Sequence, residues 1–217
     1  MSRLVAEKLG YLLLDTGALY RSIALAARDA GLSWNDEASV STLAHDTAAR
    51  GGIRFEAGTG APRVLLDGRD VSTSIRTQEI GQGASRVSAI AGVRRALLEL
   101  QRSAARAGGV VLEGRDIGTV VLPDAEAKFF LTASVAVRAE RRFKELVAKG
   151  ETPTIEAVRH DVEERDARDS ERAVAPLRQA PDAVLVDSST LTIDEVVSAI
   201  VERVKEVRAR LATSRTS

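Results

Sequence analysis

The run Gly109-Val110-Val111-Leu112-Glu113-Gly114-Arg115-Asp116-Ile117-Gly118-Thr119-Val120-Val121 decides the fold of this chain. Its apolar part, Val110 to Leu112, predicts a short strand that is buried on both faces. Charge begins where this strand should end, at Glu113, Arg115 and Asp116, between glycines that allow a close backbone approach. Because ligands of open α/β sheets bind just beyond the carboxyl ends of strands, these residues are candidate ligand contacts. The alternative is a surface turn with a local Arg–Asp pair.

A second strand end has the same character. Tyr11 to Leu14 predicts a buried strand, and Asp15-Thr16-Gly17-Ala18-Leu19-Tyr20-Arg21 then opens a helix that runs to about Ala30. A hydroxyl and the free amides of a helix N-terminus suit an anion, and Arg21 lies about one turn further on. The alternative is that Asp15 or Thr16 simply caps the helix.

Size and composition exclude several classes of protein. The chain has 217 residues, enough for one domain with a buried core, and its 31 basic and 31 acidic residues cancel. This balance argues against a nucleic-acid or membrane-surface partner. The lack of cysteine excludes disulfides and thiolate metal sites. No apolar run approaches the roughly 20 residues of a membrane span, and no signal peptide is evident, so a cytoplasmic protein is expected.

The remaining pattern predicts an α/β chain with a small antiparallel insert. Expected helices cover 2–9, 36–50, 74–87, 93–106, 134–149 and 192–212, and expected strands cover 53–56, 63–66, 127–131 and 183–186. The insert is the pair of strands 53–56 and 63–66, separated by residues 58–62, and Asp67-Gly68 is a strong tight-turn dipeptide.

A helix expected over 154–173 is unusually rich in charge. Arg165, Arg168, Asp169 and Arg172 follow helical spacing and therefore share one face. Such a helix suits a mobile lid that closes on a charged ligand. The alternative is a solvated helix held by pairs such as Arg165–Asp169.

Arginines thus occur in three stretches, at Arg21, at Arg115 and on the face from Arg165 to Arg172. Arginines from several elements that converge on one cleft suit a phosphate group, because each guanidinium forks onto phosphate oxygens. Three segments resemble the bacterial cytidylate kinase family: Leu14 to Arg21, Gly114 to Val121, and the run Glu164-Arg165-Asp166-Ala167-Arg168-Asp169-Ser170-Glu171-Arg172-Ala173-Val174-Ala175-Pro176-Leu177. The resemblance covers nearly the whole chain, in order, and includes the small β insert.

The resemblance implies a fold and an activity. The fold would be a P-loop nucleoside-monophosphate-kinase-like parallel sheet flanked by helices, in a single domain over 1–217. Residues 51–106 would form the acceptor-nucleotide-binding insert region, and residues 150–173 the lid. The activity would be transfer of a phosphoryl group from ATP to CMP or dCMP, with Mg²⁺. The expected partners are these small molecules, without nucleic acid or membrane, and the expected state is a monomer.

The resemblance also implies roles for individual residues. The acceptor phosphate would be held by Thr16, Arg21, Arg115 and Arg172. Cytosine would be read by Ser85, Arg94 and Asp116, and the sugar would be contacted by Arg165 and Asp169. Arg138 and Arg142 would reach the ATP phosphates and, with Arg115 and Arg172, would be the catalytic residues; no metal ligand is assigned. A carboxylate at Asp116 can accept from the cytosine N4 amino group and would repel the O4 atom of uracil.

One departure from the family concerns the ATP site. The P-loop G-x-x-x-x-G-K-[ST] cradles donor phosphates, and none of the five lysines here is followed by Ser or Thr. In the family this loop follows the first strand and precedes a helix similar to residues 2–9. We therefore expect the first central strand and the P-loop to be absent from this chain. The loss of a central strand would leave a slot of roughly 9–10 Å.

Two main functions remain open from the sequence. The first is a cytidylate kinase whose N-terminus is incomplete as given. The second is a non-catalytic CMP-binding protein that has lost the ATP half-site. A third, a kinase for another nucleoside monophosphate such as UMP, is opposed by the combination of Ser85, Arg94 and Asp116.

Overall fold

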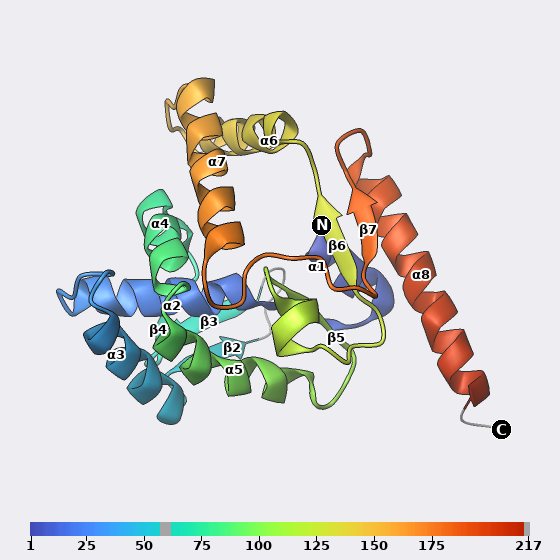
Figure 1. The fold of residues 1–217 in the computed structure, drawn as a ribbon, viewed down its shortest axis with the longest axis horizontal. Coiled ribbons are helices and arrows are strands. Elements are labelled where there is room, and N and C mark those ends of the chain that lie inside the picture. The colour runs from blue at the N-terminus through green and yellow to red at the C-terminus, as the bar shows by residue number, and fades with distance from the viewer. Residues whose placement is uncertain (57–61, 215–217) are drawn as a thin grey trace. The chain divides into compact units, whose positions relative to one another are not determined.

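The computed structural model describes residues 1–56 and 62–214 (Figure 1). Its α-helices are α1 (Ser2–Leu9), α2 (Thr16–Asp29), α3 (Glu37–Ala49), α4 (Gln78–Val87), α5 (Ala91–Ala105), α6 (Val135–Ala148), α7 (Ile155–Glu171) and α8 (Ile193–Ser214). Its strands are β1 (Leu12–Asp15), β2 (Ile53–Glu56), β3 (Arg63–Leu66), β4 (Arg69–Asp70), β5 (Val110–Glu113), β6 (Phe129–Thr132) and β7 (Val184–Asp187). A short 3₁₀ turn, η1 (Ser74–Arg76), and a single π-helical turn, η2 (Ile117–Val121), complete the elements.

The chain divides into two compact units. The N-terminal unit comprises Ser2–Ile117 together with Ala173–Ala175, and the C-terminal unit comprises Met1, Gly118–Arg172 and the chain from Pro176 onward. Both units contain parallel strands and helices, and the N-terminal unit also contains the small antiparallel sheet. The expected α/β class is therefore confirmed.

In the N-terminal unit, β1 and β5 form a parallel pair. Leu12 lies opposite Val110, and Asp15 opposite Glu113, so both strands reach their carboxyl ends at the same level. The prediction that β5 is buried on both faces is wrong, since its side chains are only partly buried or exposed. The physical reason is that β5 has β1 as its single strand partner among the described residues, and Leu12 of β1 is itself 72% exposed.

The core of the N-terminal unit forms around α2. Leu19, Ile23 and Leu25 of this helix are fully buried, and α2 packs against α3 and α4. Helices α3 and α5 also pack closely, because Gly92 lacks a side chain: a methyl group there would lie 2.1 Å from Ser41 Oγ. Helix α2 begins directly after β1, and both α2 and α5 contact β5.

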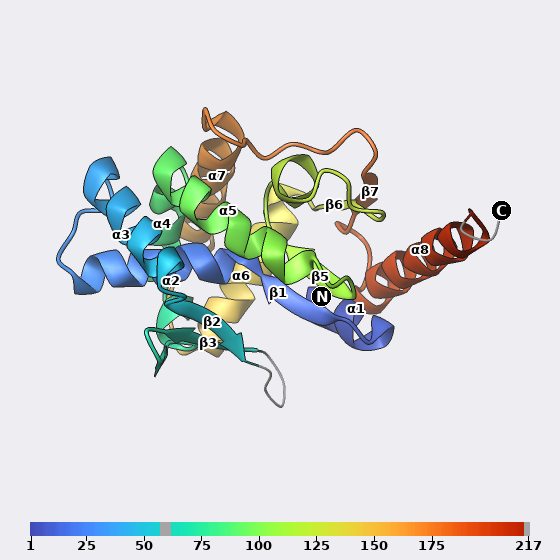
Figure 2. The ribbon, with the colours of Figure 1, turned by 90° about the horizontal axis from the view of Figure 1, so that it is seen from below.

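The antiparallel insert is present as predicted, in the order β2–β3–β4. The tight turn between β3 and β4 has positive φ angles at Asp67 (49°) and Gly68 (81°), which explains the Asp-Gly dipeptide. Figure 2 shows β2 and β3 on the side of α2 opposite α4. Of the expected connection at residues 58–62, residues 58–61 lie outside the described residues.

The helix expected over 74–87 is interrupted, so that prediction is wrong in detail. A 3₁₀ turn covers Ser74–Arg76, and α4 begins afresh at Gln78. Thr77 has extended backbone angles, and its hydroxyl accepts a hydrogen bond from Ile80 N at 3.3 Å. Thr77 therefore acts as an N-cap, and the chain turns before the helix that carries Ser85.

In the C-terminal unit, β6 and β7 form a second parallel pair, and α6 packs against α7 (Figure 1). The expected strand 127–131 is displaced to Phe129–Thr132, and it is not fully buried, because Leu131 is 45% exposed. The Thr192–Glu195 capping box at the start of α8 is confirmed by reciprocal bonds of 2.8 and 3.3 Å. No helix among the described residues has the length and apolar character to cross a membrane.

Candidate functional site

The carboxyl ends of β1 and β5 are joined directly. Thr16, the first residue of α2, donates its hydroxyl to the Glu113 carbonyl at 2.8 Å. Gly114 permits this approach, because a methyl group at Gly114 would lie 2.4 Å from Thr16 Oγ1. The two stretches that the sequence singled out are therefore side by side at one sheet edge, as expected.

The alternative that Asp15 or Thr16 merely caps α2 is not what the structure shows. Asp15 occupies the N-cap position without a side-chain cap bond, and its carboxylate instead pairs with Arg76 at 2.8 Å. The Thr16 hydroxyl is directed to Glu113. The Asp15 side chain therefore accepts no hydrogen bond from the backbone N–H groups in the first turn of α2. N–H groups at a helix N-terminus suit an anionic ligand.

Asp116 and Arg94 form a buried ion pair at this edge. Asp116 is 5% exposed and Arg94 is 8% exposed, so the alternative of a surface turn at Asp116 is wrong. Arg94 also donates to the Ser88 carbonyl at 3.1 Å, and its guanidinium lies 5.6 Å from the centre of the Tyr20 ring. Buried charges need such partners, because isolated charges are costly to remove from water.

Ser85 on α4 is connected to this pair through the backbone. The Ser88 hydroxyl donates to the Ser85 carbonyl at 3.0 Å, while the Ser88 carbonyl accepts from Arg94. A continuous series of contacts thus joins the three predicted cytosine readers, Ser85, Arg94 and Asp116. Ser88 was not predicted, because its two contacts are with a backbone carbonyl and through its own carbonyl, and neither leaves a signal in the sequence.

The Ser85 side chain has an unusual environment. Its Oγ atom is buried and has no hydrogen-bond partner among the described residues. A buried hydroxyl without a partner costs free energy, and such atoms are rare in folded proteins. A polar ligand that reached Ser85 would supply the missing bond. The other two predicted N-terminal site arginines differ in exposure: Arg21 on α2 is partly buried, and Arg115 beyond β5 is exposed.

In the C-terminal unit, the predicted lid residues form ion pairs on α7. Asp169 lies 3.8 Å from Arg165 and 3.9 Å from Arg172, so the expected shared face exists. The Asp169 and Arg172 side chains are each 6% exposed, which departs from a simply solvated helix. The helix ends at Glu171 rather than at Ala173, and Arg172 is its C-cap residue.

Arg138 and Arg142, the two arginines expected to reach ATP, both lie on α6. Arg138 forms an ion pair with Asp166 of α7 at 2.6 Å and donates to the Ala133 carbonyl at 2.9 Å. Arg142 pairs with Glu145 at 2.9 Å. The Arg138–Asp166 pair joins α6 to α7, a contact that sequence spacing alone could not reveal because the residues are 28 positions apart.

Within residues 1–56 and 62–214, no group of three or more His, Cys, Asp or Glu side chains is placed to hold a metal ion. In phosphoryl-transfer sites Mg²⁺ takes many of its ligands from substrate phosphates and water. The protein groups described above suit phosphate and base recognition.

Parallel strands flanked by helices, together with a small antiparallel sheet, form a nucleoside-monophosphate-kinase-like fold. Comparison with known proteins agrees: the family model described as cytidylate kinase matches residues 1–206. The chain belongs to the cytidylate kinase family. It is therefore a kinase, a nucleotide-binding transferase.

Individual relatives are similar over most of their length. A protein named cytidylate kinase from Geobacter sp. (strain M21) is 50% identical over 206 residues, which cover 95% of this chain and 87% of that protein. Cytidylate kinases from Syntrophotalea carbinolica and Leuconostoc mesenteroides are 50% and 46% identical and are covered to 86% and 88%. These matches do not favour the alternative of a non-catalytic binding protein.

Proposed function

We propose that this protein is a cytidylate kinase that transfers a phosphoryl group from ATP to CMP or dCMP. An oxygen of the acceptor phosphate bonds to the γ-phosphorus while the bond to the leaving ADP oxygen breaks. CDP or dCDP and ADP result. Mg²⁺ would be held largely by the substrate phosphates and would neutralise their charge.

Residue roles in this proposal follow the chemistry of each side chain. The acceptor phosphate is assigned to Thr16, Arg21, Arg115 and Arg172, because hydroxyls and guanidinium groups donate to phosphate oxygens. The sugar is assigned to Arg165 and Asp169, and the ATP phosphates to Arg138 and Arg142. Residues 51–106 are assigned to acceptor-nucleotide binding and residues 150–173 to a lid, and the protein is proposed to act as a cytoplasmic monomer.

One observation supports cytosine recognition above the others: the Ser85 hydroxyl is buried and has no partner within residues 1–56 and 62–214, and Ser85 is linked through Ser88 to Arg94 and Asp116. Asp116 can accept from the N4 amino group of cytosine, whereas uracil presents an acceptor at the same position. The Ser85 hydroxyl can then complete its hydrogen bonding with the base. Binding of cytosine would relieve the cost of the unpaired hydroxyl.

Ser85→Ala tests this proposal, because the hydroxyl makes no hydrogen bond to any of the described residues. We expect CMP affinity to fall by roughly fivefold to a hundredfold, the range of one good base contact. The free energy of unfolding should stay the same or rise, since the variant loses only an unpaired buried hydroxyl. Calorimetric titration with CMP and urea unfolding measure the two quantities.

Ser103→Ala is the matched control. Ser103 is an exposed helical serine whose hydroxyl bonds to the Leu100 carbonyl at 3.0 Å. Its replacement should leave CMP affinity unchanged. Wild-type CMP affinity in Ser85→Ala would contradict the proposed role of the hydroxyl.

A further inference from the structure

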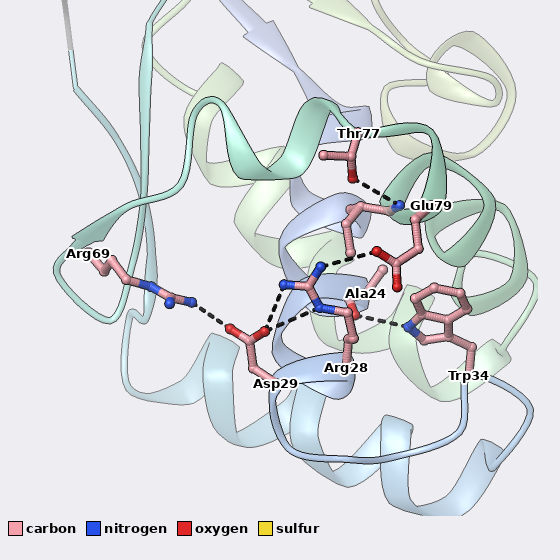
Figure 3. Close-up of polar contacts among 8 residues, drawn as sticks. Ala24, Arg28, Asp29, Trp34, Arg69, Thr77 and Glu79 are labelled. Carbon is pink, nitrogen blue, oxygen red and sulfur yellow. Dashed lines mark hydrogen bonds and ion pairs between the residues drawn. The ribbon is translucent and has the colours of Figure 1, made fainter. Parts of the chain in front are cut away.

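Trp34 lies between the two helices that carry the predicted phosphate and base contacts. Its indole nitrogen donates to the Ala24 carbonyl of α2 at 2.9 Å, as Figure 3 shows. Ala24 is one helical turn beyond Arg21. The partly buried Trp34 ring also packs against the core of the N-terminal unit. Trp34 therefore reaches α2 directly through a hydrogen bond.

The same ring contacts α4 very closely. A methyl group at Gly83 would lie 2.5 Å from Trp34 Cε2, well inside the 3.4 Å at which ordinary van der Waals contact begins. The Arg86 guanidinium lies 5.9 Å from the centre of the ring, within range of a cation–π contact. The absence of a side chain at Gly83 thus lets the indole approach the helix backbone.

Ser85 lies between these two contact residues in sequence but faces another direction. At 3.6 residues per turn, Ser85 is rotated by about 200° from Gly83 around the axis of α4. The ring therefore supports one side of α4, while the Ser85 hydroxyl belongs to nearly the opposite side. A shift of α4 away from Trp34 would move Ser85 relative to α2.

We propose that Trp34 is a positioning residue for Ser85 and thereby helps to set the preference for cytosine over uracil. This inference rests on the proposed function of the Ser85, Arg94 and Asp116 group. Trp34 acts by holding the distance between α2 and α4 and makes no contact with the nucleotide. A misplacement of about 1 Å is sufficient to weaken a directional contact severely.

A second link between α2 and α4 provides a matched control. Arg28 of α2 pairs with Glu79 of α4 at 3.3 Å, and Asp29 accepts from Arg69 at 2.6 Å (Figure 3). The Arg28 and Glu79 side chains are 40% and 58% exposed, so water screens their attraction. Glu79→Gln should therefore alter base preference by less than about twofold.

The experiment measures dissociation constants for CMP and UMP by calorimetry in five proteins besides the wild type. These are Trp34→Leu, Gly83→Ala, the double variant, Glu79→Gln and Ser85→Ala. We expect Trp34→Leu and Gly83→Ala each to lower the preference for CMP over UMP by roughly tenfold. The double variant should equal Trp34→Leu, because the new methyl group then no longer meets the indole.

Several outcomes would overturn the inference. One is an unchanged preference for CMP over UMP in Trp34→Leu. Another is an equal loss of affinity for CMP and UMP in that variant. A third is a loss of preference in the double variant that equals the sum of the two single losses. Where Gly83→Ala does not fold, Trp34→Leu and the double variant carry the test, with folding checked by circular dichroism. If the wild type itself shows no preference for CMP, the proposed function fails; if only Ser85→Ala alters the preference, the Trp34 inference alone fails.

Discussion

At the residue scale, Asp116 has a structural role in its ion pair with Arg94, and we propose a second role for it in base recognition. It is buried with Arg94, so Asp116→Ala would leave an arginine charge buried without that partner. We expect the free energy of unfolding to fall by about 3–5 kcal/mol. We also expect most of the preference for CMP over UMP to be lost, since the acceptor for the N4 amino group is gone.

Urea unfolding and calorimetric titration check these two effects, and a second variant separates them. Asp116→Ala with Arg94→Leu removes both charges and should regain part of the stability without regaining base preference. A double variant that still prefers CMP would show that the carboxylate does not read the base.

A pH dependence is expected from Asp70 in the antiparallel insert. Hydrogen bonds from the Ser72 hydroxyl and amide, together with Arg63, lower the pKa of the Asp70 carboxyl from 3.8 to about 2. Because the folded state prefers the ionised form, this contribution to stability is present above pH 3.8 and is lost as the pH falls toward 2. The Tm difference between wild type and Asp70→Asn should therefore be positive at pH 6 and shrink below pH 4. A difference that is constant from pH 6 to pH 2.5 would contradict this linkage.

The pairing of individual residues was the least predictable part of the site. The motifs indicated Thr16, Arg94 and Asp116, and the structure places the last two in one ion pair. The partners Arg76 and Ser88 could not be predicted, because they are brought to the site by the turn of the chain around Thr77 and the end of α4. Local patterns do not record contacts between distant segments.

At the element scale, periodicity predicted most helices and strands but not their surroundings. The apolar runs of β5 and β6 indicated buried strands, yet both are partly exposed. A short apolar run has the same sequence signature in a central strand and in a strand with one neighbour. The break at Thr77 was missed for a similar reason, because a threonine cap inside an apolar pattern resembles an ordinary helical residue.

Helix α7 provides a test of the lid. Arg172 has a buried side chain near Asp169, whereas Arg159 lies on the same helix in an exposed pair with Glu163 at 3.0 Å. Arg172→Ala should weaken the binding of CMP by about 1.5–3 kcal/mol, the value of a charge-assisted hydrogen bond. The binding of cytidine, which has no phosphate, should be weakened much less.

Calorimetry with both ligands makes this comparison, and Arg159→Ala is the control, expected to bind CMP as the wild type does. If Arg172→Ala lowered the affinities for CMP and cytidine equally, the arginine would act through the folding of α7 and not on the phosphate.

At the scale of the whole molecule, the 217 residues contain phosphate- and base-binding motifs but no G-x-x-x-x-G-K-[ST] run. An amide cradle with one lysine is a loop geometry that scattered arginines do not reproduce. We therefore predict that a polypeptide of these 217 residues alone binds CMP but transfers phosphate from ATP only at background rate. A coupled assay for ADP release tests this, with a chain extended before α1 by an apolar strand and such a loop for comparison. Rapid turnover by the 217-residue chain would contradict the prediction.

The chain has a single tryptophan, and Trp34 is in contact with α4 through Gly83 and Arg86. Indole emission responds to nearby charge and to exposure to water. The protein thus carries an intrinsic optical reporter that contacts the helix bearing Ser85. Movement of α4 during nucleotide binding can be followed by fluorescence in real time, without a label and without a second tryptophan to confuse the signal.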